Sequence, residues 1–205
     1  MSTESDVAEK RPARQWGRTL QTRRTILNAA RDVFLEEGYA DANIAHIVER
    51  SGLSVGSVYH HFNGKADLFL ELWREFEAVY IEAATAAVAD ARRSGVTDPI
   101  DLFVAGSRGY LDVARDNSGL TLLFRGGDGP PGYNAMGGDV GREWQKNNRI
   151  LLGLDDTPTN RLRVRILTSV VVEGERTIAA SEDLAVIDDL VIEVLTIVRL
   201  VASAR

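Results

Sequence analysis

The stretch NIAHIVERSGLSVGSVYHHFNGK, residues 43–65, contains two short helical patterns separated by a turn. Asn43 is placed as the N-cap of the first pattern, since its side-chain oxygen can accept an unpaired backbone N–H. Gly52 is placed to make the turn. The first pattern consists of apolar residues at the i, i+3, i+4 spacing of one helical face: Ile44, Ile47 and Val48.

The second pattern predicts a short helix from the N-cap Ser54 to about Phe62. Val58 and Phe62 lie four residues apart on one side of this helix, and the other sides carry polar or aromatic residues: Ser57, Tyr59, His60 and His61. Two helices joined by a tight turn are typical of a helix-turn-helix, in which the second helix enters the major groove of DNA. We therefore expect the helix after Ser54 to read DNA.

The composition of the whole chain is that of a globular protein. Its 205 residues are 44% hydrophobic and 26% charged, enough for one large domain or a small domain fused to a larger one. Cysteine is absent, which excludes disulfides, thiolate nucleophiles and cysteine-bound metals and fits a reducing compartment. No run of 18 apolar residues occurs, and residues 1–24 lack the apolar core of a secretory signal. We expect a cytoplasmic protein with no membrane partner.

The net charge of −6 is unusual for a DNA-binding protein, so the distribution of charge matters. Residues 1–70 hold nine Lys or Arg and nine Asp or Glu, leaving 15 of the 24 basic and 21 of the 30 acidic residues for residues 71–205. The segment 10–24 has six basic residues and no acidic one. Such a local basic surface fits contact with phosphates, although for residues 10–18 alone a solvated charged tail remains an alternative.

Residues 1–21 show no helical periodicity, and we predict a flexible basic arm there. From Thr22 an apolar pattern predicts a helix that ends at Gly38. Arg23 and Arg24 would then lie in its first turn, where the helix dipole disfavours positive charge. We interpret the two arginines as a clamp for an external phosphate.

The run TILNAARDVFLEEGYADANIAHIVERSGLSVGSVYHHFNGKADLF, residues 25–69, resembles the DNA-binding domain of the TetR family of bacterial transcription regulators. The Gly38-Tyr39 pair, the turn at residues 51–54, the segment 58–62 and Lys65 followed by Asp67-Leu68 stand in the family's order and spacing. Two positions depart from the family pattern. Ala42 replaces a usual Thr and removes a hydroxyl contact to phosphate, and Val48 replaces a usual Ala between the two helices.

Beyond Phe69 the resemblance extends only to an all-helical pattern. We predict helices over residues 65–92, 98–117, 139–152, 159–180 and 182–202, with a short apolar piece at residues 120–124 and residues 125–134 as a connector or a lid. The fold class is therefore all-α, with about nine helices in total. The expected domains are the arm at residues 1–21, a three-helix DNA-binding domain at 22–68, and an effector-binding and dimerisation domain at 69–205.

The candidate DNA contacts follow from the helix-turn-helix. Val55 is placed to touch a thymine methyl group, Ser57 to hydrogen-bond a base edge, and Tyr59 to meet either base or phosphate. Gly56 indicates either close approach to DNA or tight packing on the preceding helix. The full set comprises Arg23, Arg24, Asn43, Ser54, Val55, Gly56, Ser57, Tyr59, His60 and Lys65. His60 and His61 are not expected to bind metal, because adjacent helical residues point about 100° apart.

The resemblance implies that the larger domain binds a small, largely apolar effector. The candidate pocket residues, which are alternatively plain core, are Trp73, Phe76, Phe103, Tyr110, Phe124, Trp144, Glu173 and Arg176. A ligand that tilts the helix over residues 65–92, which belongs to both domains, would weaken DNA binding.

The resemblance also implies a homodimer through the two C-terminal helices. Independently, the last helix carries two apolar stripes, although a central helix in a monomer is an alternative. The expected interface residues are Arg176, Ile187, Val191, Val194, Val198 and Val201.

Taken together, the pattern predicts a dimeric regulator, by the family's usual mode a repressor, that binds a near-palindromic operator in double-stranded DNA. An architectural or ligand-independent DNA-binding protein is one alternative. An all-α enzyme is another, although the sequence contains no Ser-His-acid set, metal cluster or phosphate-binding glycine loop. No cofactor and no metal are expected.

Overall fold

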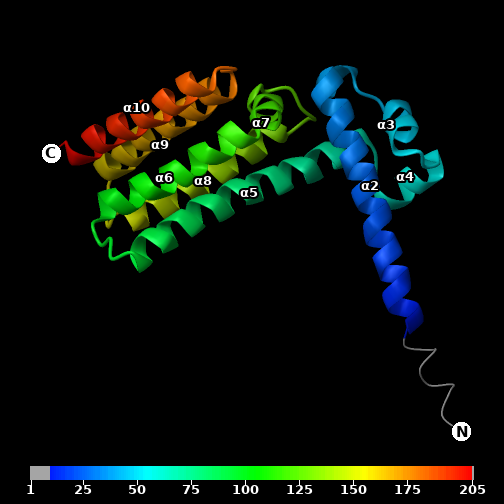
Figure 1. Cartoon of the computed structure of the whole chain (residues 1–205), viewed down its shortest axis with the longest axis horizontal. Helices are drawn as coiled ribbons and strands as arrows, with labels where there is room; N and C mark the ends of the chain where they lie inside the picture. The colour runs from blue at the N-terminus through cyan, green and yellow to red at the C-terminus, as the bar shows by residue number, and fades with distance from the viewer. Residues whose placement is uncertain (1–9, 205) are drawn as a thin grey trace, which may run out of the picture. The chain divides into compact units, whose positions relative to one another are not determined.

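The computed structural model describes residues 10–204, with side chains for residues 17–204 (Figure 1). Within residues 10–204 it contains nine helices and no strand, which confirms the all-α prediction. The chain divides into two compact units, Met1–Leu72 and Trp73–Arg205, so the division falls four residues after the predicted one. No helix within the described part is long and apolar enough to cross a membrane.

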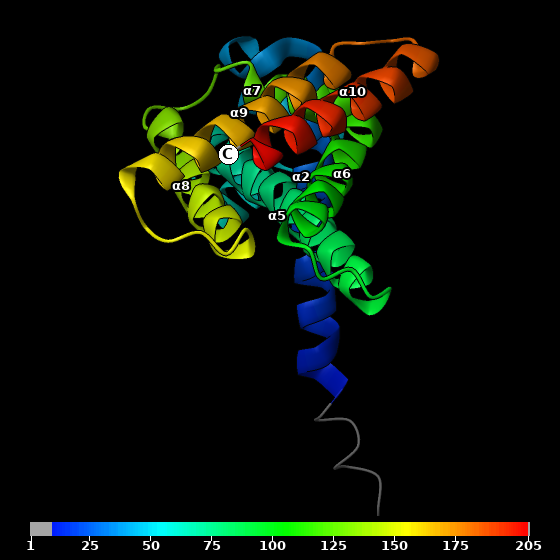
Figure 2. The same ribbon diagram turned by 90° about the vertical axis from the view of Figure 1, so that its left-hand side faces the viewer.

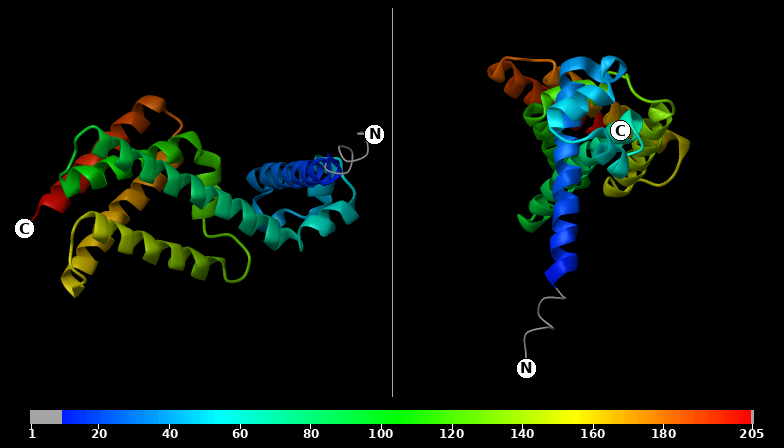
Figure 3. Two further views of the ribbon diagram at one scale, coloured as in Figure 1. Left: turned by 90° about the horizontal axis from the view of Figure 1, so that it is seen from below. Right: turned by 90° about the vertical axis from the view of Figure 1, so that its right-hand side faces the viewer.

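The first unit consists of α2 (Lys10–Asp41), α3 (Ile44–Ser51), α4 (Val55–His61) and the first turns of α5 (Lys65–Arg93). α3 and α4 lie beside the C-terminal half of α2 (Figures 1 and 3). The buried side chains come from all four helices and include rings that pack edge to face, Phe34 against Phe69 at 5.5 Å between centroids. The core of this unit comprises Ile26, Ala30, Val33, Phe34, Ile47, Val58, Phe62, Leu68 and Phe69.

α2 begins earlier than the sequence pattern indicated. It is helical from Lys10, so residues 10–21, predicted as part of a flexible arm, continue the helix; residues 1–9 of that arm lie outside the described residues. The apolar pattern did not reveal this part of α2, because residues 10–21 contain few apolar residues and so show no helical periodicity. At the other end, Gly38 has φ 75° and interrupts the helical backbone where a left-handed residue was expected.

The capping residues around the turn take their predicted places. The Asn43 side-chain oxygen accepts the His46 N–H at 3.1 Å, and the Ser54 hydroxyl accepts the Ser57 N–H at 3.1 Å. Gly52 has φ 67°, and its N–H donates to the Val48 carbonyl at 3.1 Å. Each contact satisfies a backbone group that a helix end leaves unpaired, which fixes where α3 ends and α4 begins.

The second unit holds the rest of α5 and five further helices: α6 (Pro99–Asp116), α7 (Ser118–Arg125), α8 (Tyr133–Leu151), α9 (Pro158–Ala179) and α10 (Leu184–Ser203). α6 begins as predicted, since the Asp98 carboxylate accepts the N–H groups of Ile100 and Asp101 at 2.8 and 3.1 Å. α8 and α9 are joined by a short connection visible at the yellow turn in Figure 3.

The predicted loop 125–134 is shorter in the structure, where only residues 126–132 are non-helical. α8 starts at Tyr133, six residues earlier than predicted, because Tyr133 is buried and its hydroxyl donates to the Phe124 carbonyl at 2.6 Å. Gly137, Gly138 and Gly141 made this stretch a poor helix by propensity, and the tertiary contact outweighs that preference.

α9 and α10 lie side by side (Figures 1 and 2), and their close approach depends on Gly174. A Cβ atom at Gly174 would lie 2.6 Å from a methyl carbon of Val194. Gly109 plays the same part between α5 and α6, since its Cβ would lie 2.7 Å from the Ala83 carbonyl oxygen. Both glycines let helix backbones pack more closely than any larger residue allows.

Candidate nucleic-acid interface and effector site

α4 exposes one face that carries most of the predicted base contacts. Val55 and Tyr59, four residues apart, are 52% and 54% exposed, while Val58 is fully buried. A Cβ atom at Gly56 would meet only the Ser54 hydroxyl, at 3.9 Å, so packing on the preceding helix does not require this glycine. The exposed face thus carries one apolar and one aromatic side chain, Val55 and Tyr59.

The phosphate clamp proposed for Arg23 and Arg24 rested on a helix starting at Thr22, and that premise is wrong. Both residues lie well inside α2 and far from its first turn. Arg23 forms an ion pair with Glu71, donates to the His61 carbonyl at 3.4 Å, and stacks on the Phe62 ring. Arg23 therefore fastens α2 to α4 and α5, whereas the exposed Arg24 stays a predicted phosphate contact.

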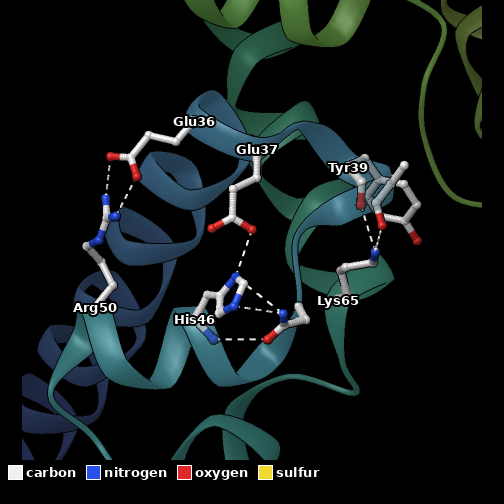
Figure 4. Close-up of polar contacts among 8 residues, drawn as sticks. Glu36, Glu37, Tyr39, His46, Arg50 and Lys65 are labelled. Atoms are coloured by element: carbon white, nitrogen blue, oxygen red, sulfur yellow. Dashed lines mark hydrogen bonds and ion pairs between the residues drawn. The ribbon is translucent and has the colours of Figure 1, made fainter.

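Lys65 is also committed to contacts inside the first unit. Its Nζ donates to the Tyr39 carbonyl at 2.7 Å and to the Ala40 carbonyl at 3.0 Å, and it lies 4.5 Å from the centre of the Tyr39 ring (Figure 4). A cation at these carbonyls caps the end of α2 and ties it to the start of α5. Lys65 thus has a structural role within the first unit, and its predicted contact with phosphate stays a prediction.

Two polar contacts that the sequence reasoning missed join α2 to α3 (Figure 4). Arg50 donates to both Glu36 carboxylate oxygens, at 2.6 and 2.5 Å, and the His46 ring lies 2.8 Å from a Glu37 carboxylate oxygen. A spacing of fourteen residues between Glu36 and Arg50 gives no local signal, since it depends on how α3 folds back on α2.

The histidine pair at the end of α4 is split between surface and interior. His60 is exposed, as a phosphate contact requires, and His61 is half-buried with its ring centre 5.0 Å from that of His60. Burial lowers the pKa of His61, and the positive neighbours His60 and Arg23 add to this effect. His61 is therefore a neutral packing residue at neutral pH.

In the larger unit, the predicted pocket aromatics mostly come together. Phe76 packs on Phe124 at 4.9 Å between ring centroids, and Tyr110 lies 5.5 Å from Trp144. Trp73 and Phe103 are buried as well. The structure therefore gathers most of these rings into one aromatic interior.

Glu173 and Arg176, the predicted polar groups of the pocket, point away from it. Both are exposed and face each other on the surface of α9, 3.6 Å apart. The inward carboxylate is Glu175, which is fully buried. Helical periodicity contained the signal, because Glu175 follows Val171 by four residues and precedes Ile178 by three, on the same buried face.

Glu175 belongs to a buried ion network that the sequence did not reveal. Arg125 donates to Glu175 at 2.9 Å, to Glu77 at 2.6 Å and to the Tyr110 hydroxyl at 3.2 Å. The Tyr110 hydroxyl donates in turn to Glu175 at 2.8 Å, and the Tyr80 and Thr121 hydroxyls lie 2.8 Å apart. α5, α6, α7 and α9 each contribute at least one of these groups.

Burial dominates the titration of this network. It raises the pKa of Glu175, although Arg125 and Tyr110 act in the opposite direction. Burial also raises the pKa of Tyr110 well above its ordinary value, with the Glu175 charge adding to the effect. For Arg125, burial acts against the charged form, but Tyr110, Glu175 and Glu77 outweigh it and raise the pKa. The guanidinium is charged at every pH at which the protein is folded.

The predicted dimer stripe on α10 is the wrong one. Ile187, Val191, Val194 and Val198 are buried within their own domain, so they are not available to a second subunit. Val201 is only half-buried and Arg176 is exposed. Other large apolar side chains of α9 and α10 are exposed instead: Leu162, Ile166, Leu184, Val186, Ile192 and Leu200. The two stripes were equally apolar, and only the packing of α10 on α6 and α9 distinguishes them.

Among the residues with described side chains, no group of three or more His, Asp or Glu is arranged to hold a metal ion.

Comparisons with known proteins agree with this arrangement. Residues 26–72 match the family described as bacterial regulatory proteins, tetR family. The HTH-type transcriptional repressor AcnR of Corynebacterium glutamicum is 37% identical over 79 residues, which are 38% of this chain and 42% of AcnR. The HTH-type transcriptional activator FasR of Mycolicibacterium smegmatis is 30% identical over 122 residues, 57% of this chain and 53% of FasR. The chain thus spans about half the length of these curated relatives.

A solved structure extends the likeness to both units. The transcriptional regulator FadR of Bacillus subtilis, in complex with stearoyl-CoA, superposes with a TM-score of 0.64 over 87% of this chain and 97% of FadR. At 16% sequence identity this likeness concerns the fold. With its helix-turn-helix and the match over residues 26–72, the first unit carries the domain of bacterial regulatory proteins of the tetR family, and the whole chain shares its fold with a solved transcriptional regulator.

Proposed function

We propose that the protein is a transcriptional repressor that binds a near-palindromic operator as a homodimer and leaves it when a small ligand binds the larger unit. The observation that carries the proposal is the exposed face of α4, where the Val55 and Tyr59 side chains lie outside the core of the first unit. An exposed apolar and aromatic pair on a short helix is costly in water and suits thymine methyl groups and base edges.

The DNA-binding part is tested with duplex DNA from the region upstream of the protein's own gene. Footprinting should show a protected near-palindrome, and fluorescence anisotropy should show affinity that falls steeply with salt. Tyr59→Ala should weaken binding about tenfold or more through lost base or backbone contact. Leu122→Ala, an equally exposed apolar position on α7, is the matched control and should leave the affinity unchanged. An unprotected upstream region would overturn the proposal.

A dimer is supported by the exposed apolar residues of α9 and α10. Leu162 of α9 and Leu200 of α10 are 56% and 67% exposed, and they lie on two helices that pack along each other. A second copy would cover them and place two α4 helices about 34–36 Å apart, one turn of DNA. Leu200→Glu should therefore shift the protein toward monomer in sedimentation velocity and weaken operator binding, whereas Leu122→Glu should do neither. A wild-type monomer at micromolar concentration would contradict the dimer.

Ligand control is supported by the continuity of α5, which begins in the first unit and continues through the second. A ligand that binds one conformation of the second unit more tightly than another shifts the conformational equilibrium of α5. The free energy of this shift cannot exceed the difference between the two binding free energies. The FadR structure contains stearoyl-CoA, so a regulator of this fold can hold a small molecule. If no candidate ligand changed the affinity of the operator complex in a titration, the repressor would be ligand-independent.

A further inference from the structure

The interior of the larger unit holds a guanidinium in surroundings that resemble a ligand site. Arg125 is the last residue of α7, and its donors reach Glu77 of α5, Glu175 of α9 and Tyr110 of α6. Both carboxylates are almost completely buried, Glu77 being 5% and Glu175 0% exposed. The partners of the guanidinium therefore come from three helices, and the guanidinium itself from a fourth.

The balance of charge in this cluster favours positive occupants. One guanidinium faces two carboxylates, so the cluster carries an excess of negative charge whenever both acids are ionised. Burial raises the pKa of Glu175, which is the response expected of an acid whose charge is incompletely compensated. An anion entering this space would be repelled by Glu77 and Glu175, whereas a cation would gain two charge-assisted hydrogen bonds.

Aromatic rings complete the surroundings of the guanidinium. Its central carbon lies 5.1 Å from the centre of the Phe76 ring and 5.7 Å from that of Tyr80. Tyr110 packs on Tyr80 with 4.5 Å between ring centroids. Cations are attracted to ring faces within about 6 Å, and the carboxylates of Glu77 and Glu175 lie beside these rings on the same guanidinium. Arg125 occupies the place that such a cation would take.

The position of Arg125 in the chain allows it to leave. It is followed by residues 126–132, in which Gly127 and Gly132 have φ 84° and 86°. Movement of Arg125 would therefore involve only the last turn of α7 and a loop with two conformationally permissive glycines, not the middle of a helix. In addition, the buried Trp73 N–H has no hydrogen-bond partner among the described residues, and its ring packs on Tyr133, 5.6 Å between centroids. A donor left unsatisfied in the same aromatic interior is a second group that a ligand can pair with.

We propose that Glu77, Glu175 and the rings of Phe76, Tyr80 and Tyr110 bind an organic cation, an aromatic amidinium or guanidinium, and that Arg125 fills its place in the ligand-free protein. The inference rests on the proposed function in taking this cation to be the effector. It narrows the expected chemical class of the effector from an apolar molecule to one with an apolar body and a planar cationic group. Binding is an exchange in which the ligand's cation takes the carboxylates and Arg125 moves toward water.

The test uses the full-length protein and three probes of nearly identical shape, measured by isothermal titration calorimetry. Benzamidine is cationic, benzamide is neutral and benzoate is anionic at pH 7.5. Benzamidine should bind at least tenfold more tightly than benzamide, and benzoate should bind no better than benzamide. Glu175→Gln should weaken the binding of benzamidine at least tenfold. Glu173→Gln changes a glutamate exposed on the same helix and should leave this affinity unchanged. Equal binding of the three probes, or no binding of benzamidine, would overturn the proposal.

A rescue experiment separates a ligand site from a purely structural ion network. Arg125→Ala vacates the cationic place, so benzamidine should bind this variant more tightly than the wild type and raise its melting temperature further. Benzamide should not produce this difference. If Arg125→Ala does not fold, the wild-type probe series decides alone. Operator footprinting is run in parallel: a protected operator without benzamidine binding refutes only the cation site, while benzamidine binding without a protected operator refutes the proposed function.

Discussion

Two arginines of this protein form the same contacts in opposite surroundings. Arg50 of α3 holds the Glu36 carboxylate at 2.5 and 2.6 Å on the surface of the first unit, and Arg125 of α7 holds Glu175 and Glu77 at 2.9 and 2.6 Å inside the second. Water screens the charges of the first pair, but it reaches the second network hardly at all. Similar distances therefore correspond to very different energies, and contact geometry alone does not rank the two pairs.

The largest difference is expected when each arginine is replaced by an uncharged residue of similar length. Arg125→Met leaves two buried carboxylates without their partner, which should lower the free energy of unfolding by about 3–5 kcal/mol. Arg50→Met, the matched control, leaves Glu36 in water and should change the urea midpoint little. Urea unfolding followed by circular dichroism measures both variants. A similar loss in the two would mean that burial does not govern these pairs.

A smaller effect is expected for glycine to alanine changes at a packed and an open position. At Gly174 a methyl group would collide with Val194, so Gly174→Ala should cost about 1–3 kcal/mol through overpacking. At Gly141, inside α8, nothing lies within 4 Å of the added atom. Gly141→Ala should stabilise the protein by roughly 0.5–1 kcal/mol, because alanine is the better helix former. Thermal unfolding of the two variants compares them, and destabilisation by Gly141→Ala would contradict the open environment.

The two glutamates should also respond to pH with opposite sign. Burial raises the pKa of Glu175, so the folded state holds its proton more tightly, and stability is lost as pH rises from the ordinary glutamate pKa through the raised one. The hydrogen bond from Arg50 lowers the pKa of Glu36, so its contribution is present above the ordinary pKa and is lost as pH falls through the lowered one.

This contrast is measured as the unfolding free energy of the wild type minus that of the variant, from pH 3 to pH 8. The difference should fall with rising pH for Glu175→Gln and rise for Glu36→Gln. Arg125, Tyr110 and Tyr80 face Glu175 from α7, α6 and α5, and none of them changes charge in this range. Two slopes of the same sign would show that Glu175 is hydrated or that Glu36 is not paired in solution.

Local signals in the sequence were sufficient for the helix ends and for the helix-turn-helix. Asn43, Ser54 and Asp98 act on backbone groups two or three residues away, and Gly38 and Gly52 act through their own φ angles, so short patterns identify them. The family resemblance then supplied the fold class. Contacts between distant residues gave no such signal.

What escaped sequence analysis depends on how helices pack. Arg23 meets Glu71, and Arg125 meets Glu77 and Glu175, across 48 to 50 residues of chain. The sequence pattern assigned Arg23 to a phosphate clamp and Arg125 to the loop over residues 125–134. Likewise, both stripes of α10 were apolar, and only the position of α9 and α6 decides which one is buried. The candidate DNA contacts on α4 and at Lys65 rested on local pattern and remain predictions, whereas Arg23 is engaged in contacts within the first unit.

The smallest effect is expected from a double-mutant cycle on the exposed pair. Arg50→Met, Glu36→Gln and the double variant should give a coupling free energy close to the error of the urea measurement, because water and ions screen the two charges and the side chains lose freedom when they pair. Raising sodium chloride from 0.05 to 0.5 M should reduce even that remainder. A coupling that persisted at high salt would show that the pair is shielded from solvent in the full-length protein. The Arg50–Glu36 pair would then resemble the buried Arg125 network, and burial would not explain a difference in their contributions to stability.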